Sequence, residues 1–232
     1  MTLGLTSLLS PVSDHRLHAL IESFRESRLE VQFVDGTWVE RRQALDGGDA
    51  QIGWLCGLLH TELKAGTRWP LSAVAAPRST RNAARGDPVY FGDVVVAEDS
   101  PYRSLVDLEG AVFAYNEEAS LSGYRMMIDA LHAGGTDLTH FGRAMRSGSH
   151  MASMDLVRAG DADCAIIDST LIDDLEPVGL VVVESIGPYP APPLVAHADH
   201  APSVGAAAVA AGWAPVDDRL YDTLRAGART SR

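Results

Sequence analysis

Apolar positions recur along the chain in two alternating patterns, which predict strands and helices in succession. Short apolar runs, typical of buried strands, cover residues 3–9, 31–34, 51–55, 71–76, 90–97, 111–115, 164–167 and 180–185. Stripes with helical spacing comprise Leu17, Leu20, Ile21 and Phe24; Tyr124, Met127, Ile128 and Leu131; and Met151, Met154 and Val157. Shorter helices are expected over residues 38–45, 58–64, 204–211 and 217–226. This alternation favours an α/β fold with parallel sheets and helices on both faces.

The alternation stops and restarts twice, near residues 90–97 and again near residues 187–195. The second interruption is rich in proline, which forces an extended path. Two crossing strands with a complete α/β unit between them predict two lobes. We expect lobe 1 to hold residues 1–92 and 190–232 and lobe 2 to hold residues 93–189. The default ligand site is then the cleft between the lobes, at the carboxyl ends of the strands.

The composition excludes several function classes. The chain has 232 residues and a formal net charge of −12. Nucleic acids and anionic membranes need a basic surface, so neither is an expected partner, whereas a small anion can still bind in a locally positive pocket. Cys56 and Cys164 form neither a disulfide framework nor a zinc site, and the histidines show no metal spacing. We therefore expect two buried thiols, no metal and no cofactor.

The sequence also bears on location. No stretch approaches the length of a membrane span, so membrane insertion is not expected. Residues 1–13 have no Lys or Arg before their short apolar run and do not have the pattern of a signal peptide. As written, the chain is expected to be cytoplasmic. If a leader was removed, the protein is periplasmic or extracellular, and an ABC permease becomes a possible partner.

The loop over residues 116–124 is the first candidate anion site. A strand leads into it and an amphipathic helix follows, so free amides and the helix dipole attract an anion. Ser120 and Ser122 add hydroxyl donors, Gly123 allows a ligand to approach the backbone, and Tyr124 opens the helical stripe. The alternative is that the serines only cap the helix.

Three further segments are candidates for the site. Ser149 and His150 begin the helix that carries Met151, as either ligand contacts or ordinary cap residues. Cys56 and Gly57 follow a strand of lobe 1, where a glycine turn exposes amides. Asp168 follows another predicted strand. It either accepts a hydrogen bond from a ligand or caps the next helix, for which Ser169 and Thr170 are also candidate caps.

The order and spacing of several blocks resemble the phosphonate-binding family of ABC-transporter solute-binding proteins (the phosphate, phosphite and phosphonate group). The blocks are residues 88–96, 100–110, 116–124, 147–154, 160–169 and 187–194, with a looser match at Trp54-Leu55-Cys56-Gly57. The resemblance implies a two-lobed, type II periplasmic-binding-protein-like fold with two crossover strands, which closes on its ligand by hinge motion. It also implies that the two loops hold the oxyanion of the ligand, through Ser120, Ser122, Gly123, Tyr124, Ser149 and His150.

Two departures from the family pattern lie beside the first serine. Leu121 stands where similar members tend to have a polar residue, and Glu118-Ala119 replaces a frequent Pro-Gly pair. A carboxylate of Glu117 or Glu118 near the site repels a dianion unless it is turned outward.

Three functions are compatible with these observations. The leading hypothesis is binding of a small anion of the phosphonate or phosphate type, without catalysis. The second is a cytoplasmic enzyme on the same fold that acts on a small carboxylate or phosphorylated metabolite, with His150, Asp168 or Cys56 as the reactive group. The third is a sensor that reports ligand occupancy to a partner protein. No G-x-S-x-G, P-loop, G-x-G-x-x-G or H-E-x-x-H motif is present to favour the enzyme.

Overall fold

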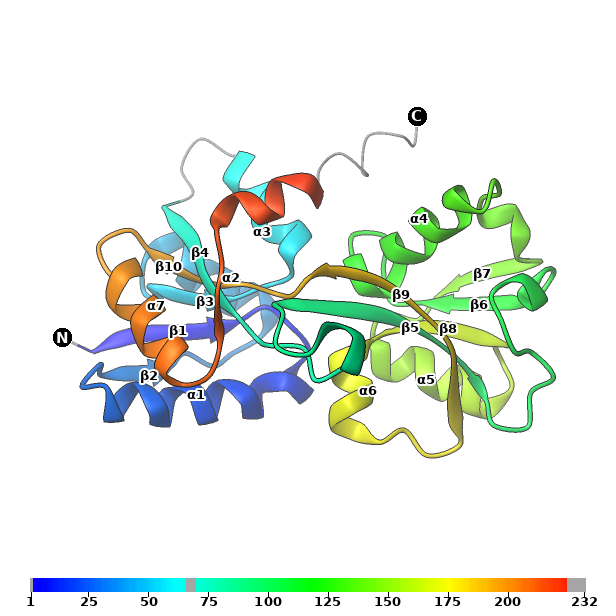
Figure 1. The fold of residues 1–232 in the computed structure, drawn as a ribbon, viewed down its shortest axis with the longest axis horizontal. Helices are drawn as coiled ribbons and strands as arrows, with labels where there is room; N and C mark the ends of the chain where they lie inside the picture. The colour runs from blue at the N-terminus through cyan, green and yellow to red at the C-terminus, as the bar shows by residue number, and fades with distance from the viewer. Residues whose placement is uncertain (1, 66–69, 225–232) are drawn as a thin grey trace. The chain divides into compact units, whose positions relative to one another are not determined.

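The computed structural model of the protein describes residues 2–65 and 70–224, and the chain divides into two compact units (Figure 1). Unit 1 consists of Met1–Val89 and Pro190–Arg232, and unit 2 consists of Tyr90–Tyr189. Within the described segments, no helix has the length and apolar character needed to cross a membrane. Each unit has its own sheet, and the two are described separately below.

Unit 1 is built on a six-stranded sheet in the order β11-β4-β10-β3-β1-β2. Its strands are β1 (Leu3–Ser7), β2 (Val31–Phe33), β3 (Ile52–Trp54), β4 (Leu71–Ala76), β10 (Leu194–His197) and β11 (Ala214–Pro215). The first three are parallel, but β10 runs antiparallel to β3 and β4, and β11 runs antiparallel to β4. The expectation of parallel sheets is therefore wrong for these two strands. Strand β10 enters this sheet from unit 2 and not through a β-α-β crossover from β3 or β4, and parallel neighbours need such a crossover connection.

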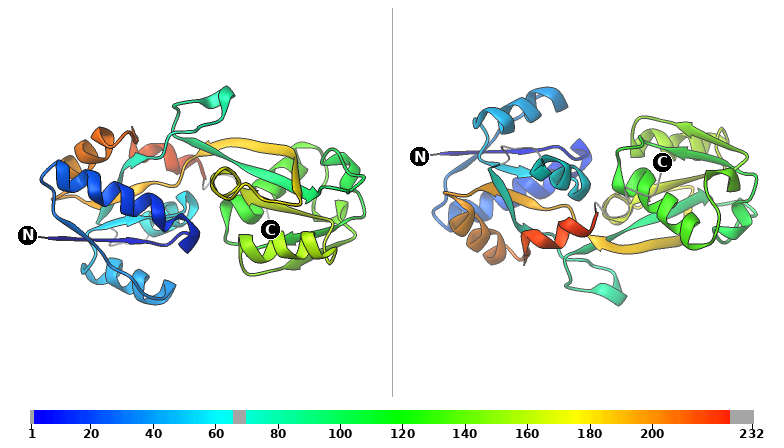
Figure 2. Two further views of the ribbon diagram at one scale, coloured as in Figure 1. Left: turned by 90° about the horizontal axis from the view of Figure 1, so that it is seen from below. Right: turned by 90° about the horizontal axis from the view of Figure 1, so that it is seen from above.

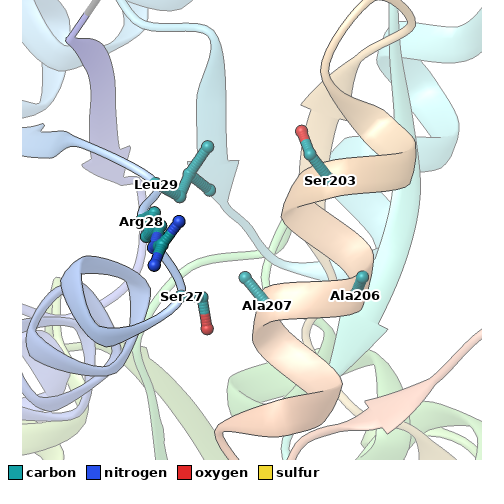
Figure 3. Close-up of a pocket in the computed structure, with 6 residues that line it drawn as sticks. All are labelled: Ser27, Arg28, Leu29, Ser203, Ala206 and Ala207. Carbon is teal, nitrogen blue, oxygen red and sulfur yellow. The ribbon is translucent and has the colours of Figure 1, made fainter.

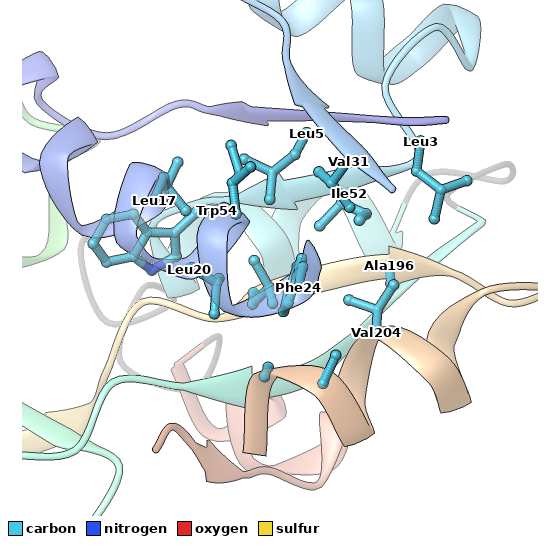
Figure 4. Packing of buried hydrophobic residues seen from close by; sticks show 14 of the residues in the cluster. Leu3, Leu5, Leu17, Leu20, Phe24, Val31, Ile52, Trp54, Ala196 and Val204 are labelled. Atoms are coloured by element: carbon cyan, nitrogen blue, oxygen red, sulfur yellow. The ribbon is translucent and has the colours of Figure 1, made fainter. Parts of the chain in front are cut away.

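Helices pack against both faces of this sheet. They are α1 (Asp14–Glu26), α2 (Trp38–Gly47), α3 (Gly57–Ala65) and α7 (Ala201–Ala210). The predicted stripe of α1 is confirmed, because Leu17, Leu20, Ile21 and Phe24 are all buried. These residues share one apolar cluster with Val204 of α7 (Figure 4). A second cluster contains Leu45 of α2 and Leu55. Adjacent residues of β10 alternate between the clusters, as the pleat of a strand requires.

The 3₁₀ segment η6 (Asp218–Thr223) is held on unit 1 by an ionic cluster. Asp218 lies at its centre: Oδ1 is 2.7 Å from His60 Nε2, and Oδ2 is 2.6 Å from Lys64 Nζ. The Lys64 ammonium also pairs with Asp222 Oδ1 at 2.8 Å. His60 is completely buried, and this burial lowers the pKa of its imidazole despite the neighbouring carboxylate of Asp218. The cluster therefore fixes η6 while His60 is neutral.

Acidification is expected to destabilise unit 1 through His60. Its folded-state pKa lies below the ordinary value of 6.5, so the folded protein binds fewer protons than the unfolded chain as the pH falls through that value. The stabilising contribution is complete above pH 6.5 and decreases below it; the lowered pKa of Asp218 adds a further loss at more acidic pH. Urea denaturation at a series of pH values measures this slope.

His60→Gln removes the titrating group and is expected to flatten the slope below pH 6.5. The matched control is His197→Gln, which changes a half-exposed histidine of unit 1. Equal slopes in His60→Gln and the wild type would show that His60 does not carry the effect.

Unit 2 contains a five-stranded sheet in the order β7-β6-β8-β5-β9. Its strands are β5 (Val89–Ala97), β6 (Val112–Tyr115), β7 (Arg143–Arg146), β8 (Cys164–Asp168) and β9 (Leu180–Pro190). Strand β6 is parallel to β7 and β8, whereas β5 is antiparallel to β8. The long strands β5 and β9 lie side by side in both views of Figure 2. They contain the boundaries between the units, so the expected pair of crossover strands is present.

The helices of unit 2 follow its parallel strands. A π-helical turn, η4 (Leu121–Arg125), leads into α4 (Met126–Ala133); α5 (His150–Ala159) follows β7, and α6 (Ser169–Leu175) follows β8. Gly160, with φ +76°, ends α5 in the left-handed conformation, as its position in the sequence predicts.

Several local expectations are wrong. Asp168, not Ser169 or Thr170, caps α6, because a carboxylate accepts from the Thr170 amide more readily than a serine at the first helical position can. The predicted C-terminal helix over residues 217–226 is the 3₁₀ segment η6 as far as the structure describes it, and residues 225 and 226 lie outside the described part. Cys164 is buried as expected, but Cys56 is only half-buried because it lies in the connection that precedes α3.

Candidate functional site

The carboxyl ends of three adjacent parallel strands, β7, β6 and β8, lie along one edge of the unit 2 sheet. The loops that follow β6 and β7 are joined by their backbones: the Ser147 amide donates to Tyr115 O at 2.7 Å, and the Gly148 amide donates to Asn116 O at 3.0 Å. Two segments that are about thirty residues apart in sequence are thus fixed side by side. Ligands of α/β proteins bind at this kind of edge.

Asn116 and Ser120 shape the first loop. Ser120 Oγ accepts from the Gly123 amide at 3.1 Å and from Asn116 Nδ2 at 3.0 Å, while Asn116 Oδ1 accepts from the Glu117 amide at 2.7 Å. Ser120 is therefore the cap of the π-helical turn, which is the alternative that the sequence left open. Asn116, which the sequence did not single out, holds the loop in shape.

Ser122 has a different environment. Its side chain is buried, and its Oγ lies 3.3 Å from Asp168 Oδ2 and 3.4 Å from His150 Nε2. Ser122 lies in η4 after β6, His150 begins α5 after β7, and Asp168 ends β8, so the fold brings the three residues together at the carboxyl edge. The distance to Asp168 exceeds the roughly 2.5–3.0 Å of an O–H···O bond, and the distance to His150 exceeds the roughly 2.7–3.2 Å of a bond between nitrogen and oxygen. The hydroxyl is therefore loosely held and can turn toward another acceptor.

One of these contacts has a fixed direction, because an ionised carboxylate only accepts. Ser122 Oγ–H donates to the Asp168 carboxylate, and Ser122 Oγ also lies against His150 Nε2. His150 Nδ1 is a buried atom that has no hydrogen-bond partner among the described residues. Burial lowers the pKa of His150, and the nearby Asp168 carboxylate opposes that shift only in part.

Asp168 caps α6, one of the two roles that its sequence position allowed, and its part in ligand binding stays a prediction. Oδ1 accepts from the Thr170 amide at 2.9 Å and from Thr170 Oγ1 at 2.6 Å, which caps α6. Oδ2 accepts only the long bond from Ser122 within the described residues. One oxygen therefore fixes the carboxylate, and the other faces the serine and histidine.

Ser149 caps α5, since its Oγ accepts from the Ala152 amide at 3.1 Å. Ser147, beside it, bonds with Ser153 Oγ at 2.6 Å and donates to Tyr115 O at 3.0 Å. These hydroxyls order the second loop. They leave His150, the first residue of α5, at the helix end where amides lack partners within the helix and attract an anion.

The two glutamates that could repel an anion are engaged elsewhere. Glu118 is exposed and accepts from Tyr115 OH at 2.7 Å, a bond that lowers the pKa of Glu118 and raises that of Tyr115 to about 12. Glu117 is exposed and lies 3.4 Å from Arg146 Nη2. Leu121 is buried, with 3% of its surface exposed, so its side chain belongs to the apolar interior.

Tyr124 and Arg125 complete the first loop. The Tyr124 ring lies 4.8 Å from that of Tyr115, and burial raises the pKa of Tyr124. The Arg125 guanidinium lies over the Tyr124 ring at 5.9 Å and donates to Glu118 O at 2.9 Å. These contacts brace the loop after Gly123.

Gly123 is required by a close backbone approach. A Cβ on it would lie 1.9 Å from Asn116 Oδ1 and 2.3 Å from Asn116 Cγ. Because the Asn116 amide is bonded on both sides, Gly123→Ala is expected to displace the loop and weaken ligand binding by at least about tenfold, the cost of losing one positioned hydrogen bond. Calorimetry measures the affinity. The control is Gly47→Ala at the end of α2 in unit 1, whose Cβ meets only Asp49 Oδ2, at 3.9 Å; equal affinities for both variants would contradict this role.

Cys56 and Gly57 belong to unit 1. Gly57 begins α3 and is buried, and a Cβ there would lie 2.9 Å from Leu224 Cδ1 and 3.0 Å from Tyr221 Cδ1. The packing of η6 thus explains this glycine. The part of Cys56 and Gly57 in ligand binding stays a prediction.

A separate groove of about 370 Å³ lies on unit 1 between the end of α1 and α7 (Figure 3). It is lined by Ser27, Arg28, Leu29, Ser203, Ala206 and Ala207, none of which is a candidate site residue. Across the described residues, no group of three or more His, Cys, Asp or Glu side chains is arranged to hold a metal ion.

Comparisons with known proteins identify the family and the fold. The family model of the phosphonate periplasmic substrate-binding protein of ABC transporters matches residues 16–218. A search of curated proteins gave no match. Among solved structures, PhnD1 of Prochlorococcus marinus MIT 9301 in complex with methylphosphonate is similar, with 18% identity, coverage of 98% of this chain and 97% of that chain, and a TM-score of 0.77.

Two further solved structures share the fold. The binding-protein component of a phosphonate ABC transporter from Pseudomonas aeruginosa has 16% identity, covers 98% of this chain and 85% of that chain, and has a TM-score of 0.68. The aliphatic sulphonate binding protein SsuA of Escherichia coli has 18% identity, covers 97% of this chain and 75% of that chain, and has a TM-score of 0.60. These similarities establish the type II periplasmic-binding-protein fold.

Proposed function

The chain belongs to the phosphonate-binding family of periplasmic substrate-binding proteins of ABC transporters, and on this premise we propose that the loops after β6, β7 and β8 hold the oxyanion of a small phosphonate-type ligand. The observation that carries the proposal is the convergence of Ser122, His150 and Asp168 at one sheet edge. A buried hydroxyl with long, weak contacts is suited to donate to an anion that approaches it.

The surroundings favour a small anion over a larger cationic ligand. Helix α5 presents its N-terminus at His150, where unpaired amides and the helix dipole attract negative charge. The glutamates of the first loop are exposed and engaged with Tyr115 and Arg146, which limits their repulsion of the ligand. An anion site is thus compatible with the acidic net charge of the chain.

We propose binding without turnover. In a nucleophilic triad the serine donates its proton to a histidine that a carboxylate orients. Here the Asp168 carboxylate accepts from Ser122, and His150 Nδ1 has no hydrogen-bond partner among the described residues, so no carboxylate orients the imidazole. This order supports recognition over nucleophilic catalysis.

The bound ligand is, in this proposal, passed to an ABC permease. The family is described as periplasmic, and delivery to a permease requires the protein to meet its ligand outside the cytoplasmic membrane. We therefore propose the periplasmic alternative in place of the cytoplasmic location that the first residues of the sequence predict.

Thermal shift against phosphate, phosphite, methylphosphonate, methanesulfonate and acetate tests the proposal. A ligand at 100 times its Kd stabilises a fold by about 2.7 kcal/mol, which raises the melting temperature by several degrees. A shift with a phosphonate-type oxyanion that saturates, with the ligand recovered unchanged, is the expected result. A response to acetate alone, or conversion of the ligand, would contradict the proposal.

A further inference from the structure

The groove between α1 and α7 is formed by unit 1 alone and has a chemistry of its own (Figure 3). Ser27, Arg28 and Leu29, at the end of α1, form one side, and α7 forms the other. Its volume of about 370 Å³ lies within the range of small-molecule pockets, which is roughly 300–1,000 Å³. The groove is therefore large enough for a small organic molecule.

Arg28 has a backbone conformation in this groove that arginine rarely adopts. Its φ is +60°, in the left-handed region, where glycine or asparagine usually ends a helix. The Arg28 amide donates to Arg25 O at 3.0 Å, and the Leu29 amide donates to Phe24 O at 2.9 Å, so the turn is fixed. Strained residues of this kind concentrate at binding sites. Because Arg28 is exposed, packing of its side chain does not account for the strain.

The charge of Arg28 is not neutralised within the part of the chain that the structure describes. Its guanidinium has no hydrogen bond or ion pair there, and neither has the Ser27 hydroxyl. Glu26 and Glu30 lie two positions away on either side and do not pair with Arg28. The end of α1 therefore offers a cation and a hydroxyl donor to a ligand in the groove.

Helix α7 gives the groove an apolar floor. Ala206 and Ala207 line it, and Leu29 packs against the apolar cluster that contains Ala207. Ser203 lies in the first turn of α7, where the helix dipole favours negative charge. Its hydroxyl already donates to His200 O at 2.9 Å. The side-chain donors left for an anion are therefore those at the end of α1.

We propose that this groove is a second binding site, which takes a small carboxylate with an apolar tail. A guanidinium matches the geometry of a carboxylate and binds it through two parallel hydrogen bonds. The short side chains of Ala206 and Ala207 leave room for the tail, and Leu29 contributes apolar surface beside them. The inference is independent of the proposed function, because the groove uses no residue of unit 2.

Three probes separate the charged and apolar parts of this site in the unaltered protein. Benzoate has a carboxylate and a ring, acetate lacks the ring, and benzyl alcohol lacks the charge. An NMR titration is expected to show saturable shifts of the Leu29 and Ala207 amide signals with benzoate, at a Kd of about 1 mM, which is typical of a ligand of this size. Acetate and benzyl alcohol are each expected to bind at least about tenfold more weakly. Equal binding of all three probes, or no shift of these signals with benzoate, would overturn the inference.

The same titration with methylphosphonate at saturation shows whether benzoate uses a separate site. The Kd for benzoate is expected to stay the same. Loss of benzoate binding would place this ligand in the site of unit 2 and overturn the inference. If methylphosphonate does not bind at all, the proposed function fails, whereas the titration with benzoate alone still decides the present inference.

Arg28→Gln tests the residue that carries the charge. It is expected to weaken benzoate binding by at least about tenfold and to leave the affinity for methylphosphonate unchanged. The matched control is Arg25→Gln, which removes the same charge from an exposed position in the last turn of α1 that does not line the groove. It is expected to keep the affinity of the wild type for benzoate. Equal affinities in Arg28→Gln and the wild type, or an equal loss in both variants, would overturn the assignment.

Arg28→Gly tests whether the arginine is kept at a cost to stability. Glycine adopts the left-handed conformation without strain, so the midpoint of urea denaturation is expected to rise while benzoate binding is lost. A lower midpoint would show that the Arg28 side chain stabilises the fold. Its presence would then need no ligand, and this result would count against the site.

Discussion

Ser122→Ala is expected to weaken the binding of methylphosphonate by about 100-fold or more. The substitution removes the one buried hydroxyl that lies between Asp168 Oδ2 and His150 Nε2. A hydrogen bond to a charged partner is worth about 1.5–3 kcal/mol, and the loss leaves the Asp168 carboxylate facing the ligand without the serine. The free energy of unfolding is expected to change by less than about 2 kcal/mol, since both bonds of Ser122 within the protein are long.

Calorimetry gives the affinity, and urea denaturation gives the stability. Ser203→Ala is the matched control, because it makes the same change at an exposed position of α7 in unit 1. Wild-type affinity in Ser122→Ala would show that this serine does not contact the ligand.

Phe113→Ala is expected to lower the free energy of unfolding by about 3–5 kcal/mol, the usual cost of removing a fully buried phenyl ring. Phe113 lies in β6 and is 0% exposed. Its ring stacks on Phe141 at 4.7 Å and on Tyr115 at 5.9 Å. The same strand leads into the loop of Ser122, so the loss of this packing also loosens the loop.

Val106→Ala provides the comparison, because Val106 is 78% exposed and is expected to change stability by under about 0.5 kcal/mol. Urea denaturation followed by far-ultraviolet circular dichroism measures both variants. A loss of less than 1 kcal/mol for Phe113→Ala would mean that β6 is not in the core of unit 2.

The sequence predicts the elements whose apolar pattern agrees with their burial. Helix α1 is predictable because Leu17, Leu20 and Phe24 repeat at helical spacing and all are buried. Strand β8 is predictable because a continuous apolar run from Cys164 is buried on both faces.

Strands β7 and β10 could not be predicted because their apolar pattern is weak or short. Strand β7 lies at the edge of the unit 2 sheet and is mostly exposed, with Arg143 and Arg146 at its ends. Charged residues on an edge strand prevent association with other chains but remove the apolar signal. Strand β10 has only four residues and directly follows the prolines.

The candidate site could be predicted in part. Ser122, His150 and Asp168 each follow a predicted or observed strand, and the parallel order of β6, β7 and β8 brings them together. The sequence could not distinguish Ser122 from the capping serines Ser120 and Ser149, because all three precede or enter helices. The hydrogen bonds show that Ser120 and Ser149 are caps, whereas ligand contact by Ser122 is our proposal.

The most direct test of the account is a calorimetric titration of the purified protein with methylphosphonate. The account predicts saturable binding of one ligand per chain, together with loss of about 100-fold or more of this affinity in Ser122→Ala. Absence of binding to methylphosphonate, phosphite and phosphate, by a protein that circular dichroism shows to be folded, would contradict the account.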